Sequence, residues 1–357
     1  MPEKKMMRAA VYRGPRELRV EPVPVPEIGP SDVLVRVHSC GICGSDLHSY
    51  KAGMYIRPGQ IMGHEFMGTV AAAGEDVEGV EEGDRVTGFS IGVCGSCYWC
   101  SRQQYILCPE LFRNSTGYGL PGGFAEYVPI RNAVVGQSIH PVPSELDDET
   151  AATTEPVSVG VGAIEAAGVR PGDRVVVLGA GMIGNACMQA ARAAGAGQVA
   201  VIDVSPVRLE AARSLGADAV FDARTGDALS WVKELWGVGR YHFNEGGMAD
   251  VVVEAAGAPV TVQQAFEMVR SGGAIVFVGL PEEPAPIDVT KIVHKQPRIV
   301  GSLGGDFARA IELMASGSIR TKELITHRFP LEDAAEAFET QLRTGEAMKV
   351  MIQPREG

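Results

Sequence analysis

Four cysteines in one short stretch constrain this chain more than any other feature. Their spacing is C-x2-C-x2-C-x7-C, over Cys94, Cys97, Cys100 and Cys108. Four thiolates complete a tetrahedral zinc site and leave no position for a substrate. The segment from about residue 90 to residue 110 is therefore predicted to form a lobe around a structural zinc ion. Seven cysteines in 357 residues are too few for a disulfide scaffold, and their clustering favours metal ligation over cross-links.

The charge of the chain excludes several partners. The net charge is −12, and an acidic surface repels nucleic-acid phosphates and anionic lipid. The same charge and the single cluster count against a zinc-ribbon nucleic-acid module, the other interpretation of the cysteines. No apolar run approaches the roughly 20 residues of a membrane span, and residues 1–10 do not resemble a signal peptide. We therefore predict a cytoplasmic protein with neither nucleic acid nor membrane as partner.

A glycine-rich turn in the middle of the chain indicates a dinucleotide site. The segment Gly179-Ala180-Gly181-Met182-Ile183-Gly184 follows a predicted strand and opens a predicted helix. Its glycines permit a tight turn and a close approach to a pyrophosphate, and the helix N-terminus attracts the anion. Asp203 ends the next predicted strand, where a carboxylate can bind ribose hydroxyls, so we predict NAD rather than NADP. Arg208 works against that preference, because a nearby arginine can accept a 2′-phosphate.

The pattern of elements changes near residue 157. Residues 8–150 are predicted to be β-rich, with short apolar runs separated by Gly and Pro. Strands and helices then alternate, which predicts a doubly wound parallel sheet. The predicted strands of this sheet are 174–178, 198–202, 219–221, 250–253 and 274–278, and the helices are 182–194, 206–215, 227–236 and 260–270. The tail adds helices over 306–315 and 331–342 and a strand over 348–352 that returns to the first domain.

A second candidate metal site has an open position. Cys43 and His64 are two candidate ligands, Glu155 is a plausible third, and Glu65 is an alternative or transient ligand. Three protein ligands leave one position for a substrate oxygen or water. A bound zinc lowers the pKa of an alcohol, which can then lose its proton near neutral pH and release hydride. A lone Cys and a lone His are more often core residues, and the dinucleotide motif is what favours ligation here.

Taken together, these motifs resemble those of a known family, the zinc-dependent medium-chain alcohol dehydrogenases. The segments Gly41-Ile42-Cys43-Gly44-Ser45-Asp46-Leu47-His48 and Gly63-His64-Glu65 look like the zinc signature of that family. The four-cysteine lobe adds to the resemblance, as do segments 123–127, 155–156, 254–257 and 325–327. The resemblance extends from about residue 8 to residue 352. Within the family the chain is similar to the branch of sorbitol, butanediol and threonine dehydrogenases.

The resemblance implies an α/β protein in which a Rossmann domain interrupts a GroES-like β-rich catalytic domain. The expected boundaries are 1–156 and 304–357 for the catalytic domain and 157–303 for the Rossmann domain, with the active site in the cleft between them. It implies that Cys43, His64 and Glu155 hold a catalytic zinc ion with Glu65 close by. Asp46 would then orient His64 from behind the metal.

The resemblance also implies a proton relay and a set of cofactor contacts. Ser45 would take the alcohol proton, and the relay would run through the nicotinamide ribose to His48, which can exchange it with solvent. Lys349 matches a basic position that meets the cofactor phosphates. The expected cofactor-binding residues are Gly179, Gly181, Met182, Ile183, Gly184, Asp203, Arg208, Gly257, Val278 and Lys349.

These expectations combine into an oxidoreductase with two zinc ions per chain. It would transfer a hydride between NAD and a secondary alcohol, diol or polyol. The alternatives are a zinc-free quinone or enoyl reductase of the same superfold and a non-enzymatic NAD-binding protein. The family branch suggests a homotetramer, in which the strand over 274–278 would pair between subunits at the sheet edge.

Three further features bear on the substrate. Ile91 and the segment 50–55 depart from the threonine dehydrogenases, so threonine is not the expected substrate. Tyr50, with Glu155, could hold a second hydroxyl of a vicinal diol, and the alternative is that Tyr50 only packs against its loop. The segment 239–248 is longer than the usual loop of the family, and we interpret it as a surface or assembly feature.

Overall fold

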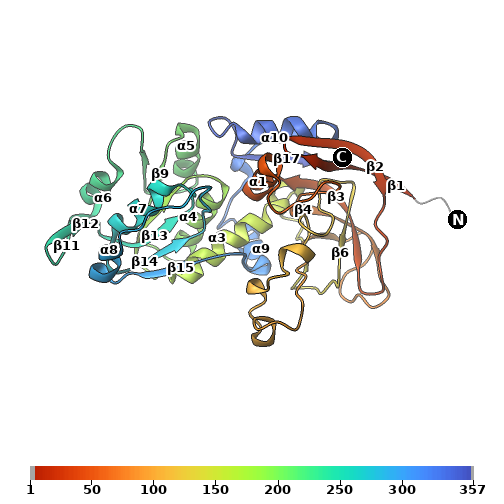
Figure 1. Ribbon diagram of the computed structural model, residues 1–357, viewed down its shortest axis with the longest axis horizontal. Helices are drawn as coiled ribbons and strands as arrows, with labels where there is room; N and C mark the ends of the chain where they lie inside the picture. Colours follow the sequence, from red (N-terminus) through yellow and green to blue (C-terminus); the bar gives the residue numbers. More distant parts are fainter. Residues whose placement is uncertain (1–4, 355–357) are drawn as a thin grey trace. The chain divides into compact units, whose positions relative to one another are not determined.

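The computed structural model describes residues 5–354, and the chain forms two compact units. The first unit runs to Glu155 and resumes at Leu324, and the second spans Pro156–Glu323. Figure 1 shows a β-rich first unit and a second unit in which strands alternate with helices. The second boundary lies after residue 323 rather than at the expected 303/304. One reason is that Arg320 exchanges hydrogen bonds of 2.8 and 3.0 Å with Gln189, on a helix of the second unit.

The first unit is built on a sheet of seven strands. Their order is β16-β17-β3-β4-β5-β7, and β6 pairs with β3. The bounds are β3 Val33–Gly41, β4 Glu65–Ala73, β5 Arg85–Gly88, β6 Tyr127–Ile130, β7 Ile139–Pro141, β16 Ile325–Pro330 and β17 Lys349–Gln353. A separate hairpin is formed by β1 Met6–Gly14 and β2 Glu17–Pro24, and the helices are α1 Gly44–Ala52, α2 Asp148–Ala152 and α10 Ala334–Leu342. Because β17 pairs with β3, the prediction that the last strand returns to the first domain is confirmed.

The sequence of β3 explains how this sheet is buried. Val33, Val35 and Val37 alternate along the strand and are fully buried, as expected for a strand with one face on a core. Phe124 and Phe338 pack edge to face in the same core, with ring centroids 5.4 Å apart. The packing fixes the end of β3, and it is from this end that the chain enters α1 and the candidate zinc site.

The second unit contains a six-stranded parallel sheet in the order β10-β9-β8-β13-β14-β15. This is the strand order of a Rossmann fold, which confirms the predicted fold class. The strands are β8 Arg174–Leu178, β9 Gln198–Asp203, β10 Ala219–Asp222, β13 Ala249–Glu254, β14 Val269–Phe277 and β15 Arg298–Gly301. The helices are α3 Thr154–Ala167, α4 Met182–Ala193, α5 Pro206–Ser214, α6 Ala228–Trp236, α7 Pro259–Met268, α8 Val289–Lys295 and α9 Phe307–Ala315. No helix among residues 5–354 has both the length and the apolar character that crossing a membrane requires.

The sheet edge differs from the prediction. The strand predicted over 274–278 is part of β14, which pairs with β13 on one side and with β15 on the other. It is therefore an internal strand, and the expectation that it lies at the edge is wrong. The sequence misses β15 because Arg298–Gly301 is only four residues long and mostly exposed, so it carries no apolar run.

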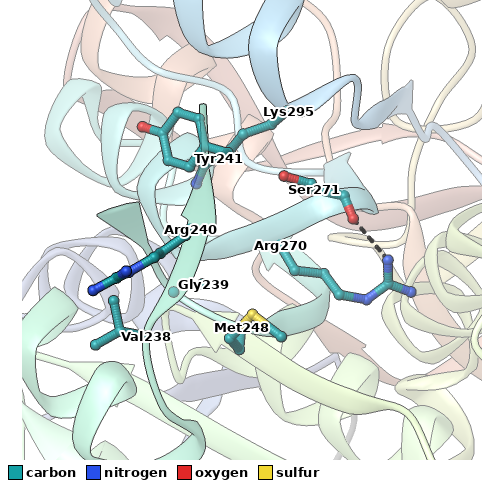
Figure 2. A pocket seen from close by; sticks show the side chains of 9 residues that line it. Val238, Gly239, Arg240, Tyr241, Met248, Arg270, Ser271 and Lys295 are labelled. Carbon is teal, nitrogen blue, oxygen red and sulfur yellow. Dashed lines mark hydrogen bonds between the residues drawn. The ribbon is translucent and has the colours of Figure 1, made fainter. Parts of the chain in front are cut away.

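The long segment before β13 forms a small surface hairpin of β11 Gly239–Tyr241 and β12 Asn244–Gly246. A pocket of about 310 Å³ adjoins the hairpin. Figure 2 shows the side chains that line it, among them Tyr241, Arg270 and Lys295. The ammonium of Lys295 is buried, donates to three backbone carbonyls at 2.7 to 2.8 Å and lies over the Tyr241 ring. This pocket is at the amino ends of β13 and β14, whereas a dinucleotide binds at the carboxyl ends of such strands.

Candidate active site and zinc centres

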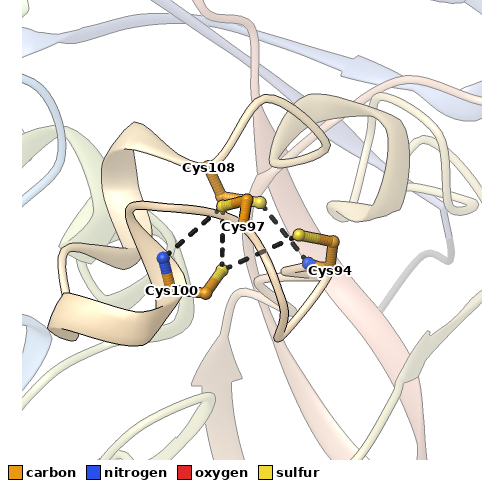
Figure 3. Close-up of side chains that lie close together, drawn as sticks. All are labelled: Cys94, Cys97, Cys100 and Cys108. Atoms are coloured by element: carbon orange, nitrogen blue, oxygen red, sulfur yellow. Dashed lines mark hydrogen bonds between the residues drawn. The ribbon is translucent and has the colours of Figure 1, made fainter.

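The four cysteines of the lobe converge as the spacing predicts. Their sulfur atoms all lie within 4.8 Å of one another, and Figure 3 shows them pointing toward a common centre. The sulfur of Cys100 is 3.5 Å from that of Cys97 and 4.0 Å from that of Cys94. Tetrahedral Zn–S bonds of about 2.3 Å place sulfur atoms roughly 3.8 Å apart. The cluster therefore fits one zinc ion with no open position.

Local turns bring these sulfur atoms together. Two short 3-10 helices, η1 Cys100–Arg102 and η2 Tyr105–Leu107, fold the chain back between the third and fourth cysteines. The backbone N–H of Cys100 donates to the sulfur of Cys97, and that of Cys94 donates to the sulfur of Cys108. Backbone N–H groups also lower the pKa of Cys94 to about 6. These donors favour the thiolates that a metal ion needs.

The second site begins at the N-terminus of α1. Cys43 is the N-cap residue, and its sulfur accepts from the backbone N–H of Asp46, while Asp46 accepts from the backbone N–H of Cys43 at 2.9 Å. The positive end of a helix attracts negative charge, so this place suits an anionic ligand. The capping also fixes Asp46, which is 2% exposed.

His64 ends the loop before β4 and faces the same place. It is 3% exposed, and an Nδ1 to Oδ1 distance of 3.7 Å separates it from Asp46, beyond hydrogen-bond length. Ligand atoms of Cys43, His64 and Glu65 lie within 4.8 Å of one another. Burial alone would lower the pKa of His64, but the charges of Asp46 and Cys43 outweigh it and raise that pKa well above its usual value.

Glu65 and Lys349 form a buried ion pair beside this site. Nζ of Lys349 donates to Oε2 of Glu65 at 2.6 Å and to the carbonyl of Ile42 at 2.9 Å. Both side chains are almost fully buried. The predicted role of Lys349 toward cofactor phosphates does not agree with these contacts, since the ammonium is committed to Glu65. Pairing of β17 with β3, which brings the two residues together, is not visible in the sequence.

Glu155 adds another carboxylate to the same electrostatic cluster. Loss of solvent raises its pKa to about 7, while interaction with His64 opposes that rise. Cys43, Asp46, Glu65 and Glu155 all carry negative charge when ionised, and Lys349 is the ammonium that faces them. Such a cluster is unfavourable without further positive charge. A divalent cation held by the thiol, the imidazole and a carboxylate would supply it, so these residues fit a zinc ion.

A hydroxyl pair lies next to the metal-ligand candidates. The hydroxyl groups of Ser45 and Tyr118 are 3.0 Å apart, and the Tyr118 ring stacks on the His64 ring with centroids 5.0 Å apart. Burial, together with the charges of Cys43 and Asp46, raises the pKa of Tyr118 well above 10. His48 follows Ser45 by three residues on α1, a spacing that places both on one helix face. Sequence reasoning missed Tyr118, whose only signal was its position between two glycines.

Tyr50 is buried and bonded within the protein, which argues against the predicted contact with a second substrate hydroxyl. It is 2% exposed, and its hydroxyl donates to Glu339 at 2.9 Å and to the carbonyl of Arg16 at 3.3 Å. Its ring packs against Phe338 with centroids 5.0 Å apart. Tyr50 therefore packs inside the protein, as its alternative role requires, but against α10 and not against its own loop. The sequence could not show this because Glu339 comes from α10, far along the chain.

The glycine-rich loop lies between β8 and α4 as predicted. Gly181 is the N-cap residue of α4, and Met182 and Ile183 form its first turn. A Cβ at Gly184 would lie 1.8 Å from the carbonyl oxygen of Gly179, so this position requires glycine. A Cβ at Gly181 would meet only the guanidinium of Arg208, at 3.8 Å. The backbone is thus open to a phosphate at the helix N-terminus.

Asp203 at the end of β9 and Glu254 at the end of β13 accept hydrogen bonds from the loops that follow the strands. Asp203 accepts from the backbone N–H of Ala180 at 2.6 Å and from that of Ser205 at 2.8 Å. Glu254, fully buried at the end of β13, accepts from the backbone N–H of Gly257 at 2.9 Å, and its carbonyl accepts from Val278. Both predicted cofactor residues, Gly257 and Val278, therefore lie at carboxyl ends of strands, where the Rossmann fold binds dinucleotides.

Two family models match the chain. An alcohol dehydrogenase GroES-like domain matches residues 29–144, and a zinc-binding dehydrogenase matches residues 183–316. Sorbitol dehydrogenase of Bacillus subtilis (strain 168) is 37% identical, over 98% of this chain and 97% of its own length.

Solved structures agree with these matches. The structure of a zinc-binding dehydrogenase from Sinorhizobium meliloti 1021 bound to NADP has a TM-score of 0.88 at 32% identity, over 98% of this chain and 100% of its own. The structure of 2R,3R-butanediol dehydrogenase from Bacillus subtilis has a TM-score of 0.85 at 30% identity, with the same coverage. The zinc-free and non-enzymatic alternatives find no support in these relatives. The chain therefore belongs to the zinc-dependent medium-chain alcohol dehydrogenase family and is an alcohol or polyol dehydrogenase that uses zinc and NAD(P).

Proposed function

We propose that this enzyme oxidises a secondary alcohol group of a diol or small polyol with NAD, and that it catalyses the reverse reduction. The observation that carries the proposal is the convergence of ligand atoms from Cys43, His64 and Glu65 within 4.8 Å of one another, among anionic groups that a divalent cation would balance. The names of the relatives, sorbitol dehydrogenase and 2R,3R-butanediol dehydrogenase, support a polyol or diol as the substrate class.

The proposed ligands of the catalytic zinc ion are Cys43, His64 and Glu155. Glu65 is the weaker candidate because its carboxylate already pairs with Lys349 at 2.6 Å. Glu155 is the stronger candidate because its carboxylate is buried, which raises its pKa to about 7, and because its charge interacts with His64. The second zinc ion would be structural, with Cys94, Cys97, Cys100 and Cys108 as its ligands.

Bound zinc would acidify the alcohol and bound NAD would accept the hydride. The side chains of the protein would position the alcohol and move its proton. Ser45 would accept the proton at Oγ, and His48, one turn along α1, would return it to solvent. Asp46 would orient the imidazole of His64 through their charge interaction across 3.7 Å.

The walls near Ser45 suit a short carbon chain. Tyr55 and Phe112 pack against Tyr118, with ring centroids 6.4 and 5.0 Å from it. These rings give an apolar surface next to two hydroxyl groups. The carbon skeleton of a small diol or polyol would lie against these rings, with the reacting hydroxyl next to Ser45.

The preference for NAD rests on Asp203. Its carboxylate is fixed beside the glycine-rich loop, where it would bind the ribose hydroxyls and repel a 2′-phosphate. Arg208 lies by Gly181 and would favour the phosphate. The relative from Sinorhizobium meliloti is bound to NADP. Because Asp203 and Arg208 act in opposite directions, the activity of this enzyme with NAD has to be compared directly with its activity with NADP.

We also propose that the enzyme is a homotetramer in the cytoplasm, with no nucleic-acid or membrane partner. The edge strand β15 supports assembly, because an open edge with an exposed Ile299 favours symmetric pairing with a second copy. Light scattering at micromolar concentration would test the oligomeric state, and a monomer would contradict it.

The test of the proposed reaction is a panel of alcohols, diols, polyols and sugars, scored by NADH and NADPH absorbance. We expect a higher kcat/KM for butanediol or sorbitol than for ethanol, and a higher value with NAD than with NADP. Asp203→Ala should reduce the ratio of kcat/KM with NAD to kcat/KM with NADP, and Arg208→Ala should increase that ratio. A higher kcat/KM for ethanol would contradict the proposed substrate class. A higher kcat/KM with NADP would contradict the proposed role of Asp203 but not the substrate class.

A further inference from the structure

Tyr118 is fixed in place by the backbone around it. A Cβ at Gly117 would lie 2.8 Å from the carbonyl oxygen of Gly63, and a Cβ at Gly119 would lie 1.5 Å from that of Arg113. Both neighbours of Tyr118 must therefore be glycine, and the loop packs directly against the residue that precedes His64. Tyr118 itself is 8% exposed, and its ring stacks on the His64 ring at an interplanar angle of 28°.

Among residues 5–354, the hydroxyl of Tyr118 has one hydrogen-bond partner, Oγ of Ser45 at 3.0 Å. Either oxygen can donate in such a pair, but a phenol is a far stronger acid than an alkyl hydroxyl and is the better donor. A serine hydroxyl has one O–H donor and two acceptor lone pairs. When Tyr118 donates, Ser45 keeps one lone pair and its own O–H for other partners.

We propose that Tyr118 is a positioning residue for the proton-accepting hydroxyl of Ser45, a role that rests on the proposed function. Its phenol donates to Oγ and leaves the remaining lone pair to face the substrate hydroxyl. Ser45 then takes the substrate proton on Oγ as its own O–H proton leaves toward the relay. Tyr118 keeps its proton throughout, so the number of protons on the pair is unchanged after each transfer.

The first test is Tyr118→Phe, which keeps the ring on His64 and removes the hydroxyl. We expect kcat for the alcohol to fall about tenfold, as for the loss of one hydrogen bond, with KM nearly unchanged. The solvent deuterium isotope effect on kcat should rise because proton transfer becomes slower. Zinc content and the thermal midpoint should match those of the wild type. The control is Tyr241→Phe, which removes a tyrosine hydroxyl from the surface hairpin of the second unit, and it should change none of these values.

A double-mutant cycle then asks whether Tyr118 acts through Ser45. In the Ser45→Ala background, Tyr118→Phe should cause no further loss, because the hydroxyl that it positions is gone. Equal fold-losses in both backgrounds would overturn the proposal and assign Tyr118 a separate role. An unchanged kcat in the single variant would also overturn it.

A spectroscopic test is independent of turnover. Ultraviolet resonance Raman bands of tyrosine respond to hydrogen bonding of the phenol, and the wild-type minus Tyr118→Phe difference isolates Tyr118. We expect this difference spectrum to shift in Ser45→Ala, and an unshifted spectrum would overturn the pair. If the wild type oxidised no alcohol, the proposed function would fail, while this shift would still decide whether Tyr118 holds Ser45.

Discussion

The lobe around Cys94 to Cys108 takes all of its sulfur atoms from one stretch of chain, whereas the site around Cys43 takes its groups from distant segments. Cys43 caps α1, His64 precedes β4, and Glu155 lies near the start of α3. The lobe needs only short turns to bring its ligands together. The second site needs the sheet of the first unit to be complete, including β17 from the end of the chain.

The two sites also differ in how their charges are balanced. The lobe is partly exposed and has backbone donors for its sulfur atoms. The second site combines a partly buried thiol with a buried imidazole, buried carboxylates and a buried ammonium. A closed set of four ligands suits a structural ion, while three ligands with an open position suit catalysis. The comparison predicts that damage to one site removes stability and damage to the other removes turnover.

The largest effect is expected for Cys43→Ala. Without this ligand the catalytic zinc ion should be lost or misplaced, and kcat/KM should fall by about a thousandfold or more. Metal analysis should find about one zinc ion per chain instead of about two, with the thermal midpoint little changed. Cys187→Ala removes a buried thiol from α4 and should retain both ions and activity. Full activity in Cys43→Ala would break the comparison.

Cys97→Ser should act on folding instead. Structural zinc binding contributes directly to folding free energy, so we expect low solubility and a much lower thermal midpoint. Any soluble fraction should keep the catalytic ion. A variant that is as stable as the wild type but inactive would show that the lobe, not the second site, serves catalysis. Thermal scans and zinc analysis of the purified variant make the measurement.

Lys349→Met tests the buried ion pair between Lys349 and Glu65 beside the proposed catalytic zinc site. It leaves a buried carboxylate without its cation, which should lower the free energy of unfolding by about 3–5 kcal/mol. Urea unfolding of the zinc-loaded protein measures this loss. The double variant Glu65→Leu/Lys349→Met should recover part of it, and the exposed Lys51→Met should lose almost nothing. No recovery in the double variant would indicate that the loss comes from the hydrogen bond of Lys349 to the Ile42 carbonyl and not from an unpaired Glu65.

The smallest effect on stability is expected at Asp250, whose carboxylate is paired with two arginines and needs no metal ion to balance its charge. Asp250 accepts from Arg174 and Arg270 at the amino ends of β8, β13 and β14. Burial raises the pKa of Asp250, but these hydrogen bonds outweigh it and hold the pKa below its usual range. Its contribution to stability is therefore complete above the unfolded pKa of about 3.9 and is lost as the pH falls through the lower folded value.

The corresponding variant is Asp250→Asn. We expect a loss of about 1–3 kcal/mol in the free energy of unfolding near neutral pH, and a smaller loss below pH of about 3. Urea unfolding at both pH values measures the difference. A loss that did not shrink in acid would mean that Asp250 acts through shape and not through its charge. Arg240→Gln, at an exposed ion pair on the nearby hairpin, is the matched control and should show little effect.

Much of the second unit was predictable because its signals are local. The apolar run of β8 is followed at once by the glycine-rich turn and α4, and the predicted strand and helix agree with Arg174–Leu178 and Met182–Ala193. Alternation of strand and helix then leaves few possible topologies. The short strand β15 was missed because four exposed residues carry no pattern, and the sheet edge was misplaced as a result.

The sequence by itself determined the four-cysteine lobe, the dinucleotide loop and the fold class, because each depends on residues only a few positions apart. The tertiary structure alone decided which side chains meet across long separations. Tyr118 reaches Ser45 over 73 positions, Lys349 reaches Glu65 over 284, and Tyr50 turns to Glu339 over 289. Packing of distant strands and helices chooses such partners, and local conformational preferences carry no record of that choice.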